Sequence, residues 1–475
     1  MIGVHSAAAL RAAEVEFAEA NPDLDPVRLA AAAVAKRAKE IKPEGTVLVV
    51  AGTGNNGGNG LYAAAVLASE GRPVMAWLPD GPGIPGGVIA ARQAGVRFIG
   101  QAAALRLCSD VSLVIDSIYG TGGMSGLSPQ VELFAEACND IGVPVLSVDI
   151  PSGLVPDSPV VSGSCFRADW TITFSAPKLC HVAQPAAAYC GHVETVDIGI
   201  ELPSTDVHLI EEVDVARWWP WPGALDDKYS RGVLGVDTGS DKFIGAAILS
   251  TMGAVYSGAG MVRFCGPEKA VDLVLNRTPS VTIGEGKVQA WLVGCGWGVA
   301  DSERMEKVIK SGKPTVLDAE ALEVLPERLP EGWLLTPHAG ELARMLGVKR
   351  KDILKEPIRW AREAAKRWNT TILLKGSTQY IVEPNGQVTI AIGGPAWSAQ
   401  AGSGDVLSGI CGTLLASGVS PWRAGALAAS IQAMTAAAQP GPYPPGVIAQ
   451  AIPGLLGKID SERPHPIDYA RLIDA

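Results

Sequence analysis

The chain alternates short runs of β-branched and other apolar residues with longer segments of helical periodicity. In the first half the apolar runs occupy residues 46–51, 73–78, 111–116, 144–149, 170–176 and 192–199. In the second half the alternation resumes at residues 233–239 and continues to a strand pair that turns at Asn385–Gly386. Strands that alternate with helices form mostly parallel sheets covered by helices on both faces. The pattern therefore predicts an α/β fold.

The segments between these apolar runs predict several helices and one loop. Alanine-rich patterns over residues 10–20 and 26–41 predict two helices that cover the first sheet. The glycine-dense segment after residue 51 predicts a turn followed by a helix from about Gly60, and residues 81–87 predict a loop. A further helix is expected around residues 244–258.

Residues 217–222, with the sequence RWWPWP, interrupt every periodicity near the middle of the chain. A chain of 475 residues is long enough for two domains with full cores. We therefore interpret this string as a connector, place the boundary between residues 203 and 226, and predict domains over 1–212 and 222–475.

Composition and charge narrow the class of protein. Hydrophobic residues make up 47% and charged residues 19%, and no apolar run approaches the ~20 residues of a membrane span. The first residues lack a basic-then-apolar signal layout, so a cytoplasmic protein without membrane partners is expected. The net charge of −10 argues against a nucleic-acid partner. Eight cysteines without a C-x-x-C pair indicate neither a disulfide framework nor a thiolate metal site.

Residues 401–410 (AGSGDVLSGI) are the strongest candidate site in the second half. Gly402 and Gly404 allow the backbone to approach a ligand, and the free N–H groups of a helix start favour a phosphate. Asp405 would be repelled by that phosphate, so it is a candidate proton acceptor for the reacting group beside it. The alternative is that Asp405 only caps a helix. Two other strand-like runs, within residues 334–347 and 373–382, end at small or polar residues and are expected to reach the same crevice.

Polar residues in the first half follow three of the predicted strands. Asn55 and Asn56 open the glycine-rich segment after the first strand, Asp116 ends the third run, and Asp149 with Ser152 follows the fourth. Such strand ends meet at one edge of a parallel sheet, so a site is indicated there. The alternative is that the two aspartates only organise the turns after their strands.

Particular motifs resemble a known family. AGTGNNGGNG (51–60), DSIYGTGGMSG (116–126) and VDIPSG (148–153) are similar to the epimerase domain of bifunctional NAD(P)H-hydrate repair enzymes. Five later motifs are similar to its ADP-dependent dehydratase domain: residues 228–247, 293–298, 336–341, 373–378 and 401–409. The resemblance covers nearly the entire chain and implies an N-terminal Rossmann-like three-layer domain followed by a ribokinase-like α/β domain.

For the first domain the resemblance implies an epimerase of NAD(P)H hydrates that uses K⁺. The implied potassium ligands are Asn56, Asp116 and Ser152, and Asp149 is the best-placed catalytic carboxylate. Asn59 stands where the family usually has aspartate. The implied substrate contacts are Asn55, Asn56, Gly57, Gly58, Asn59, Gly120, Thr121, Gly122, Gly123, Met124, Ser125, Gly126 and Asp149.

For the second domain the resemblance implies a dehydratase with ADP as co-substrate and Mg²⁺ bridging its phosphates. Asp405 is the implied catalytic base, and substrate would also contact Ala246, Gly298 and His338. Cys295 stands where the family usually has proline. The implied ADP contacts lie in residues 375–379 and 395–404, namely Lys375, Gly376, Ser377, Thr378, Gln379, Ala401, Gly402, Ser403 and Gly404.

Two other interpretations of the sequence stay open at this point. The second half could be a sugar or vitamin kinase, which would consume ATP and leave a stable phosphorylated product. The first half could be a catalytically silent nucleotide-binding domain, for which Asn59 leaves room. We also expect a homo-oligomer.

Overall fold

The computed structural model describes residues 1–123 and 125–463. The chain divides into two compact units: an N-terminal unit, Ile2–Thr205, and a C-terminal unit, Asp206–Ala475 together with Met1. The division lies earlier than the predicted limit of 212. Strand β9 (Val207–Leu209) therefore belongs to the C-terminal unit, because it pairs there with a strand of that unit's sheet.

A parallel sheet forms the centre of the N-terminal unit, as the apolar runs predict. Its strands lie in the order β4-β3-β2-β5-β6-β7-β8, and every neighbouring pair is parallel. The register places Asp116 beside Ser147, so polar side chains gather at the carboxyl ends of the central strands. The strands are β2 (Val47–Ala51), β3 (Val74–Trp77), β4 (Arg97–Ile99), β5 (Leu113–Ser117), β6 (Val145–Val148), β7 (Trp170–Phe174) and β8 (His192–Val196).

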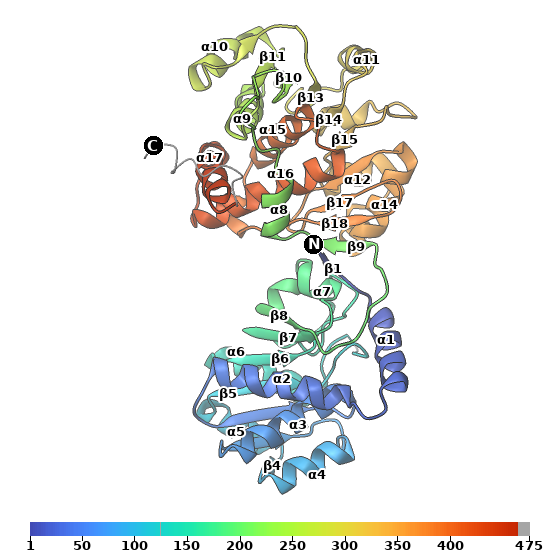
Figure 1. The fold of residues 1–475 in the computed structure, drawn as a ribbon, viewed down its shortest axis with the longest axis vertical. Helices are drawn as coiled ribbons and strands as arrows, with labels where there is room; N and C mark the ends of the chain where they lie inside the picture. The colour runs from blue at the N-terminus through green and yellow to red at the C-terminus, as the bar shows by residue number, and fades with distance from the viewer. Residues whose placement is uncertain (124, 464–475) are drawn as a thin grey trace. The chain divides into compact units, whose positions relative to one another are not determined.

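Helices cover both faces of this sheet, which gives the expected three layers (Figure 1). α2 (Pro26–Ile41), α3 (Asn55–Ser69) and α4 (Pro85–Gln93) pack on one apolar face. α5 (Gln101–Leu107) and α6 (Pro129–Ile141) pack on the other, where Trp77 meets Phe134 edge-on at 5.4 Å between ring centroids. The remaining helical elements are α1 (Ala7–Ala20), η1 (Cys108–Asp110), α7 (Leu179–Val182) and η2 (Ala186–Tyr189).

Two helix starts differ from the sequence prediction. α3 begins at Asn55 instead of about Gly60, so the NNGGNG segment forms the first turns of a helix. A Cβ on Gly57 would lie 2.0 Å from the Gly52 carbonyl oxygen, so glycine permits a backbone contact that overrides its low helix propensity. α4 begins inside the predicted 81–87 loop, because Pro85 suits the first turn of a helix.

The C-terminal unit is built on a larger mixed sheet. Its strands run in the order β9-β18-β17-β16-β15-β14-β13-β10-β11-β12. Neighbours from β16 to β12 are parallel, whereas β17 is antiparallel to β16 and β18. The strands are β10 (Val233–Asp237), β11 (Met261–Phe264), β12 (Thr282–Ile283), β13 (Ala290–Val293), β14 (Thr315–Leu317), β15 (Leu334–Leu335), β16 (Thr371–Leu374), β17 (Tyr380–Val382) and β18 (Val388–Ile390).

The helices of the C-terminal unit lie on both sides of its sheet (Figure 1). One apolar core joins the sheet to α8 (Glu212–Trp218), α9 (Ile244–Tyr256), α10 (Glu268–Arg277), α15 (Ser403–Ala416), α16 (Pro421–Ala438) and α17 (Pro445–Ser461). The opposite side carries α11 (Ser302–Ser311), α12 (Ala339–Leu346) and α14 (Pro357–Trp368). The shorter elements are η3 (Ala319–Glu323), α13 (Arg350–Lys355) and η4 (Ala396–Ser398).

Close packing of α9 against α15 fixes the helix that carries Asp405. A Cβ on Gly253 would lie 2.3 Å from the Val406 carbonyl oxygen, and one on Gly409 would lie 2.2 Å from that of Ser250. Larger side chains at these positions would push the helices apart. The apolar glycine pattern of α15 thus determines where its first turn lies.

The RWWPWP string is part of the C-terminal unit, so its interpretation as a connector is wrong. Trp219 is only 6% exposed and packs in the core with Ile210 and Val215. The Trp221 indole N–H donates to the Ala216 carbonyl at 2.8 Å. Burial of apolar indole surface stabilises this segment although no helical or strand period is present.

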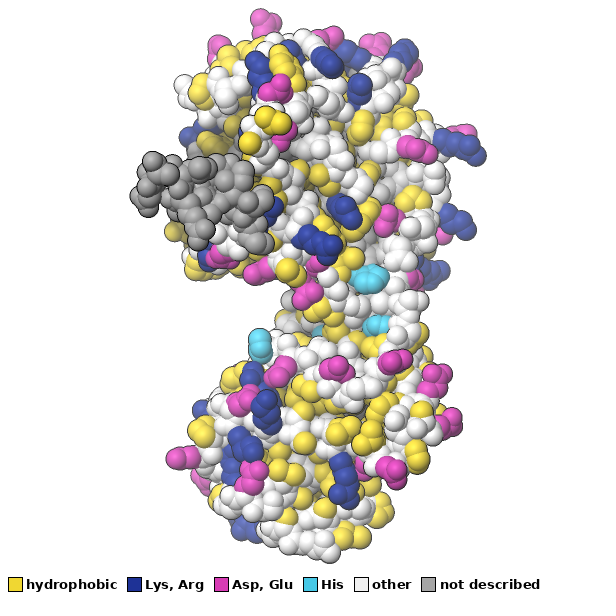
Figure 2. Space-filling model, viewed as in Figure 1, with side chains coloured by type: hydrophobic (Ala, Val, Ile, Leu, Met, Phe, Trp, Pro, Cys, Tyr) yellow, Lys and Arg dark blue, Asp and Glu magenta, His cyan; other side chains and the backbone are white. Residues whose placement is uncertain are grey.

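Two features are relevant to nucleic-acid and membrane partners: the distribution of surface charge and the length of the helices. On the face shown in Figure 2, Lys and Arg side chains are interspersed with Asp and Glu on each unit. Within residues 1–123 and 125–463, no helix combines the length and apolar character needed to cross a bilayer.

Candidate functional site

In the N-terminal unit, Asn56 lies at the edge where β2, β5 and β6 end. Its side-chain amide donates to the carbonyl oxygens of Tyr119 and Val148, each at 2.9 Å. Its Oδ1 atom is buried and has no hydrogen-bond partner among the residues that the structure describes. A buried oxygen without a partner is costly, so this atom is available to a ligand or cation.

Asp116 and Ser152 meet beside Tyr119, whose N–H donates to the Ser152 hydroxyl at 2.9 Å. The Ser152 hydroxyl donates to Asp116 Oδ1 at 2.6 Å, while the Ser152 N–H and the Ser147 hydroxyl donate to Oδ2 at 2.8 Å each. Asp116 is fully buried, and no basic side chain within the described part of the chain forms an ion pair with it. Burial raises the pKa of Asp116 to about 6, against the effect of the Ser152 hydrogen bonds.

Asp149 follows β6 in a left-handed backbone conformation with φ +70°. Its Oδ2 accepts from the Thr121 N–H at 2.8 Å, and its Oδ1 contacts the Lys178 ammonium group. Thr173 also donates to Oδ1, at 3.2 Å. Burial favours a raised pKa, but the charge and hydrogen bond of Lys178, together with the contributions of His181 and Thr173, outweigh it and lower the pKa of Asp149. This carboxylate is therefore ionised at neutral pH.

Lys178 and His181 also belong to this site, although no sequence motif indicated them. Lys178 is 1% exposed and also donates to Thr173 at 2.7 Å. The His181 ring accepts from the Lys178 N–H at 3.0 Å and lies 2.9 Å from the Asp149 carbonyl oxygen. Both residues follow β7 at the same sheet edge as Asp149, and a lysine just past a predicted strand end was the available signal.

Helix α1 brings a second carboxyl group to the site. Arg11 contacts the Thr121 carbonyl oxygen, and Glu14 lies one turn further along the same helix. Burial and then the nearby Asp149 charge raise the pKa of Glu14. The site thus contains one carboxyl group with a raised pKa, Glu14, and one with a lowered pKa, Asp149. Such pairs are common where protons are transferred.

The predicted substrate contacts of the N-terminal unit are only partly assembled. Gly120 and Thr121 lie against Asp149, since a Cβ on Gly120 would lie 2.7 Å from its Oδ2. Asn59 is buried and its Oδ1 has no partner among the described residues, whereas Asn55 is exposed.

Other predicted contacts of that unit lie elsewhere. Gly58 packs against Val27 and Ile84 of the covering layer, and Gly57 against the backbone of Gly52. The Ser125 hydroxyl is 2.6 Å from that of Ser162, and Gly126 donates to the Gly153 carbonyl at 3.0 Å. Gly122 and Gly123 follow Thr121, and the Gly123 N–H donates to the Gly120 carbonyl at 2.7 Å beside the site. Met124 lies outside the described residues.

In the C-terminal unit, the predicted anion loop leads into α15. Gly402 precedes the helix with φ +92°, and Asp405 lies in its first turn. A Cβ on Gly404 would lie 3.4 Å from the Lys375 Nζ atom, so the loop and the end of β16 meet. Ala401 and Ser403 border the same turn. The arrangement combines free helix N–H groups with an ammonium group, which suits a phosphate.

Asp318, which is not among the residues predicted from the sequence, links these elements. It follows β14, and Lys375 Nζ donates to its Oδ1 at 2.5 Å while the Ser408 hydroxyl donates to its Oδ2 at 2.8 Å. Burial alone would raise the pKa of Asp318 and lower that of Lys375. The mutual attraction outweighs burial, so the pKa of Asp318 is lowered and that of Lys375 is raised.

Among the residues that the structure describes, no lysine forms an ion pair with Asp405. Burial, and next the charge of Asp318, raise the pKa of Asp405 to about 7, although Lys375 acts in the opposite direction. Its proton occupancy therefore changes near neutral pH, which suits a group that takes up and releases protons.

The remaining predicted contacts of this unit lie at the same sheet edge. Gly298 approaches Ser240, and a Cβ on neighbouring Gly296 would lie 2.5 Å from that of Ala246. His338 is exposed, and its backbone forms an isolated parallel β-bridge with Lys375. Its ring nitrogen Nδ1 accepts from the N–H groups of Gly340 and Glu341 at the start of α12. Gly376 and Ser377 are exposed, Thr378 is buried, and Gln379 has a buried Oε1 without a partner among the described residues.

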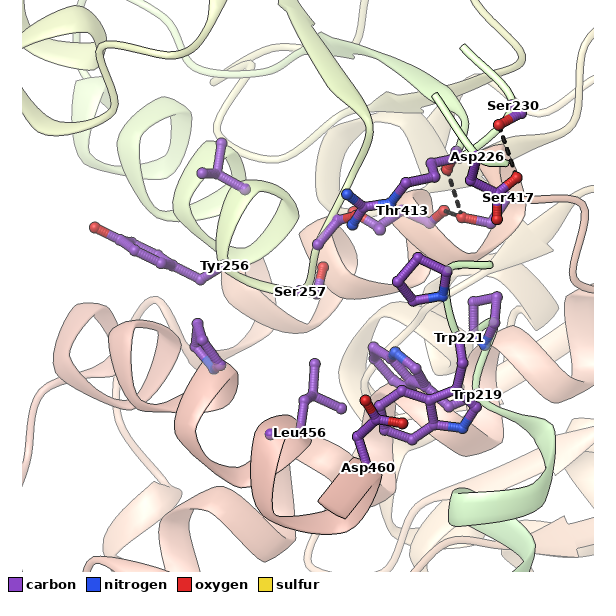
Figure 3. Close-up of a pocket in the computed structure, with 17 residues that line it drawn as sticks. Trp219, Trp221, Asp226, Ser230, Tyr256, Ser257, Thr413, Ser417, Leu456 and Asp460 are labelled. Carbon is purple, nitrogen blue, oxygen red and sulfur yellow. Dashed lines mark hydrogen bonds between the residues drawn. The ribbon is translucent and has the colours of Figure 1, made fainter. Parts of the chain in front are cut away.

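A separate cavity of about 490 Å³ opens at the far end of α15 from Asp405 (Figure 3). Trp219 and Trp221 form one wall, and Thr413 and Ser417 lie at the end of the helix. None of the predicted site residues lines it. The RWWPWP string thus contributes to a cavity that is distinct from the candidate sites.

Comparison with known proteins gives matches over both units. Residues 234–453 match the family model described as NAD(P)H-hydrate dehydratase, and residues 27–180 match that described as YjeF-related protein N-terminus. The bifunctional NAD(P)H-hydrate repair enzyme Nnr of Mycobacterium leprae (strain TN) is 36% identical over 462 residues, which cover 92% of this chain and 95% of that protein. The enzyme of the same name from Escherichia coli (strain K12) is 28% identical and covers 79% and 77% respectively.

Solved structures resemble the C-terminal unit. The ADP/ATP-dependent NAD(P)H-hydrate dehydratase of Bacillus subtilis, co-crystallized with ATP/Mg²⁺, has a TM-score of 0.51 and 25% identity, covering 54% of this chain and all (100%) of that one. A ribokinase-like protein of Enterococcus faecalis V583, at 20% identity and a TM-score of 0.50, covers 55% of this chain and 98% of its own and shares the fold.

Proposed function

Because the chain belongs to the bifunctional NAD(P)H-hydrate repair enzymes, which join an epimerase and a dehydratase in one polypeptide, we propose that epimerisation takes place around Asp149 and dehydration around Asp405. The kinase alternative is set aside, because both halves match this family. The observation that carries the proposal is one buried candidate aspartate in each unit: Asp149, after β6, has a lowered pKa, and Asp405, in the first turn of α15, has a pKa of about 7.

For epimerisation, the C6 position of the hydrated nicotinamide must exchange a proton or hydroxyl group beside a carboxylate. Lys178 keeps Asp149 ionised, so this side chain is ready to accept a proton. The Thr121 N–H and Thr173 hydroxyl hold the carboxylate in one orientation. Asn59 has a buried free oxygen and could accept a hydrogen bond from the substrate in place of the family's usual aspartate.

We assign a potassium site to Asn56, Asp116 and Ser152. The Asn56 Oδ1 atom lacks a partner, and the buried Asp116 carboxylate lacks a compensating basic group within the described chain. One negative charge with neutral oxygen donors matches a monovalent ion better than a divalent one. Potassium would neutralise Asp116 and hold the start of α3 beside the loop that carries Thr121.

For dehydration, the hydroxyl group of the S hydrate attacks the β-phosphorus of ADP, and Asp405 accepts its proton. The bond from phosphorus to AMP breaks, and the new C–O–phosphate bond then breaks as a proton leaves the adjacent carbon, which gives NAD(P)H, AMP and phosphate. Phosphate departs more readily than hydroxide. The N–H groups around Gly402 and Gly404, with Lys375, are placed to bind the transferred phosphate.

Magnesium would enter this site together with the phosphates of the nucleotide. Two strand-end carboxylates, Asp237 and Asp318, are already paired with Arg304 and Lys375. Each of these carboxylates therefore already has a basic partner, and Mg²⁺, which readily binds through phosphate oxygens and water, would be held mainly by the nucleotide. When bound, it supplies charge neutralisation between the phosphates.

A mixture of the two hydrate epimers tests both assignments. With ADP, loss of both epimers and formation of equal amounts of AMP and NAD(P)H are expected. Without ADP, a pure epimer should convert to the equilibrium mixture. Loss of one epimer only would contradict the epimerase assignment, and a stable phosphorylated product would contradict the dehydratase. An ATP arm compares the two donors, and paired NADH and NADPH hydrates compare the substrates.

We further propose that the protein acts in the cytoplasm, where nicotinamide nucleotides and ADP are available. Self-association stays a prediction, which sedimentation equilibrium of the full chain can measure.

A further inference from the structure

The proposed dehydration leaves one reactive group beside Asp405 unused. Cys295 lies in the turn after β13, and its thiol donates to Asp318 Oδ2 at 3.6 Å. Ligand atoms of Cys295, Asp318 and Asp405 all lie within 4.8 Å of one another. Cys295 and Asp318 are buried and Asp405 is half-buried, so the cluster can be reached from the side of Asp405.

We propose that Cys295, Asp318 and Asp405 form a binding site for a thiophilic divalent cation of the Zn²⁺ class. Occupation of this site would withhold Asp405 from catalysis and inhibit dehydration. The metal site rests on the geometry of the three side chains, and only the inhibition rests on the proposed role of Asp405.

The charges around the cluster favour a cation. When Asp405 is ionised, two carboxylates, Asp318 and Asp405, face one ammonium group, Lys375, which leaves one negative charge uncompensated. Zn²⁺ that binds Cys295 displaces the thiol proton, so two positive charges enter and one leaves with that proton. The buried cluster then becomes neutral. Neutralisation of a desolvated charge is favourable in such a site.

The donor set also selects the kind of metal. Zn²⁺ binds thiolate at about 2.3 Å and carboxylate at about 2.0 Å, so tetrahedral ligands lie roughly 3.5 Å apart. The 3.6 Å between Cys295 Sγ and Asp318 Oδ2 already matches this spacing. Lys375 occupies the other oxygen, Oδ1, and Ser408 can keep its bond to Oδ2. Mg²⁺ prefers oxygen ligands, so the thiol favours softer ions.

Cobalt reports directly on the sulfur ligand. Full-length protein in chelator-treated buffer without nucleotide is titrated with Co²⁺, and a saturable sulfur-to-cobalt absorption in the near ultraviolet is expected at one ion per chain. Zn²⁺ should abolish it by competition. In Cys295→Ser the Co²⁺ affinity should fall by more than about tenfold, since even the loss of a ligand's hydrogen-bond partner costs 10–100-fold.

The matched control is Cys411→Ser, because Cys411 is a fully buried thiol on α15 outside the cluster. It should leave the absorption unchanged. An equal effect of both substitutions, or no sulfur-to-cobalt absorption in the wild type, overturns the proposal.

A measurement on the wild type keeps the test valid if Cys295→Ser does not fold. X-ray absorption of the one-to-one Zn²⁺ complex should show one sulfur at about 2.3 Å and oxygen ligands otherwise. A shell with oxygen and nitrogen only overturns the site. In parallel, Zn²⁺ should inhibit dehydration reversibly. Sulfur ligation without inhibition would support the metal site and contradict Asp405 as the base.

Discussion

The two candidate sites use the same residue types with opposite effect on the proposed base. In the N-terminal unit Lys178 contacts the candidate base Asp149 directly and lowers its pKa. In the C-terminal unit Lys375 contacts Asp318 instead, and Asp405 is left with a pKa of about 7. The protonation of a buried carboxylate therefore depends on which neighbour the lysine reaches more than on the residues present.

The largest effect is expected when Asp405 loses its charge. Asp405→Asn keeps the shape of the side chain and removes the proton acceptor, so dehydration should slow by about 10²–10⁴-fold.

The same substitution should not lower stability. Because Asp405 holds its proton more tightly than an unfolded aspartate, the stability of the wild-type fold decreases as pH rises from about 4 to about 7, and the variant should be as stable as wild type or more so at pH 8. Steady-state rates and thermal unfolding measure both. Asp272→Asn, an exposed acid of α10, is the control, and retention of more than a tenth of the rate contradicts the assignment.

The next largest effect concerns the buried pair in the other unit. Lys178→Met leaves the Asp149 charge unpaired, so unfolding should become easier by about 3–5 kcal/mol and epimerisation should be lost. Lys39→Met, which breaks the exposed pair with Glu70, should cost at most about 1 kcal/mol. Chemical denaturation and epimer interconversion are measured for both. Equal stability losses would show that burial does not distinguish the two pairs.

A smaller effect is expected from replacing Asp318, the neighbouring carboxylate that raises the pKa of Asp405. Dehydration needs ionised Asp405, so the rate should rise with pH through about 7 in the wild type. Asp318→Asn removes a neighbouring negative charge and frees Lys375 to face Asp405, so the pKa of Asp405 and the midpoint of the pH profile should move to lower pH. Glu323→Gln, an exposed acid at the end of η3, should leave the midpoint in place. An unchanged or higher midpoint in Asp318→Asn would contradict this electrostatic account.

The smallest effect is expected from the monovalent cation. Replacing K⁺ by Na⁺ should slow epimerisation by a few-fold without affecting dehydration, because the larger ion loses its hydration more easily. Asp116→Ala should slow epimerisation more severely and abolish the difference between the two salts. Asp110→Ala, at the end of η1, serves as the control. Equal wild-type epimerisation rates in the two salts would remove the potassium site.

The local pattern of the sequence was enough to predict most elements and the loop before α15. Short continuous runs of β-branched and other apolar residues indicate buried strands, and the Gly-x-Gly string before Asp405 indicates a helix start, which α15 has. Predictions from the local pattern were wrong for two segments whose structure depends on tertiary packing. Glycine-rich residues 55–60 became helical because Gly57 packs on Gly52, and the aperiodic RWWPWP string joined a core.

The sequence by itself determined most of the strands and helices and placed Asp116 and Asp149 at strand ends, because these features depend on neighbours a few residues apart. The tertiary structure decided which charges meet. Lys178 reaches Asp149 across 29 residues, and Lys375 reaches Asp318 across 57. Strand order brings these groups together, and burial then makes their interaction strong, so neither pairing nor the resulting pKa could be inferred from residue types along the chain.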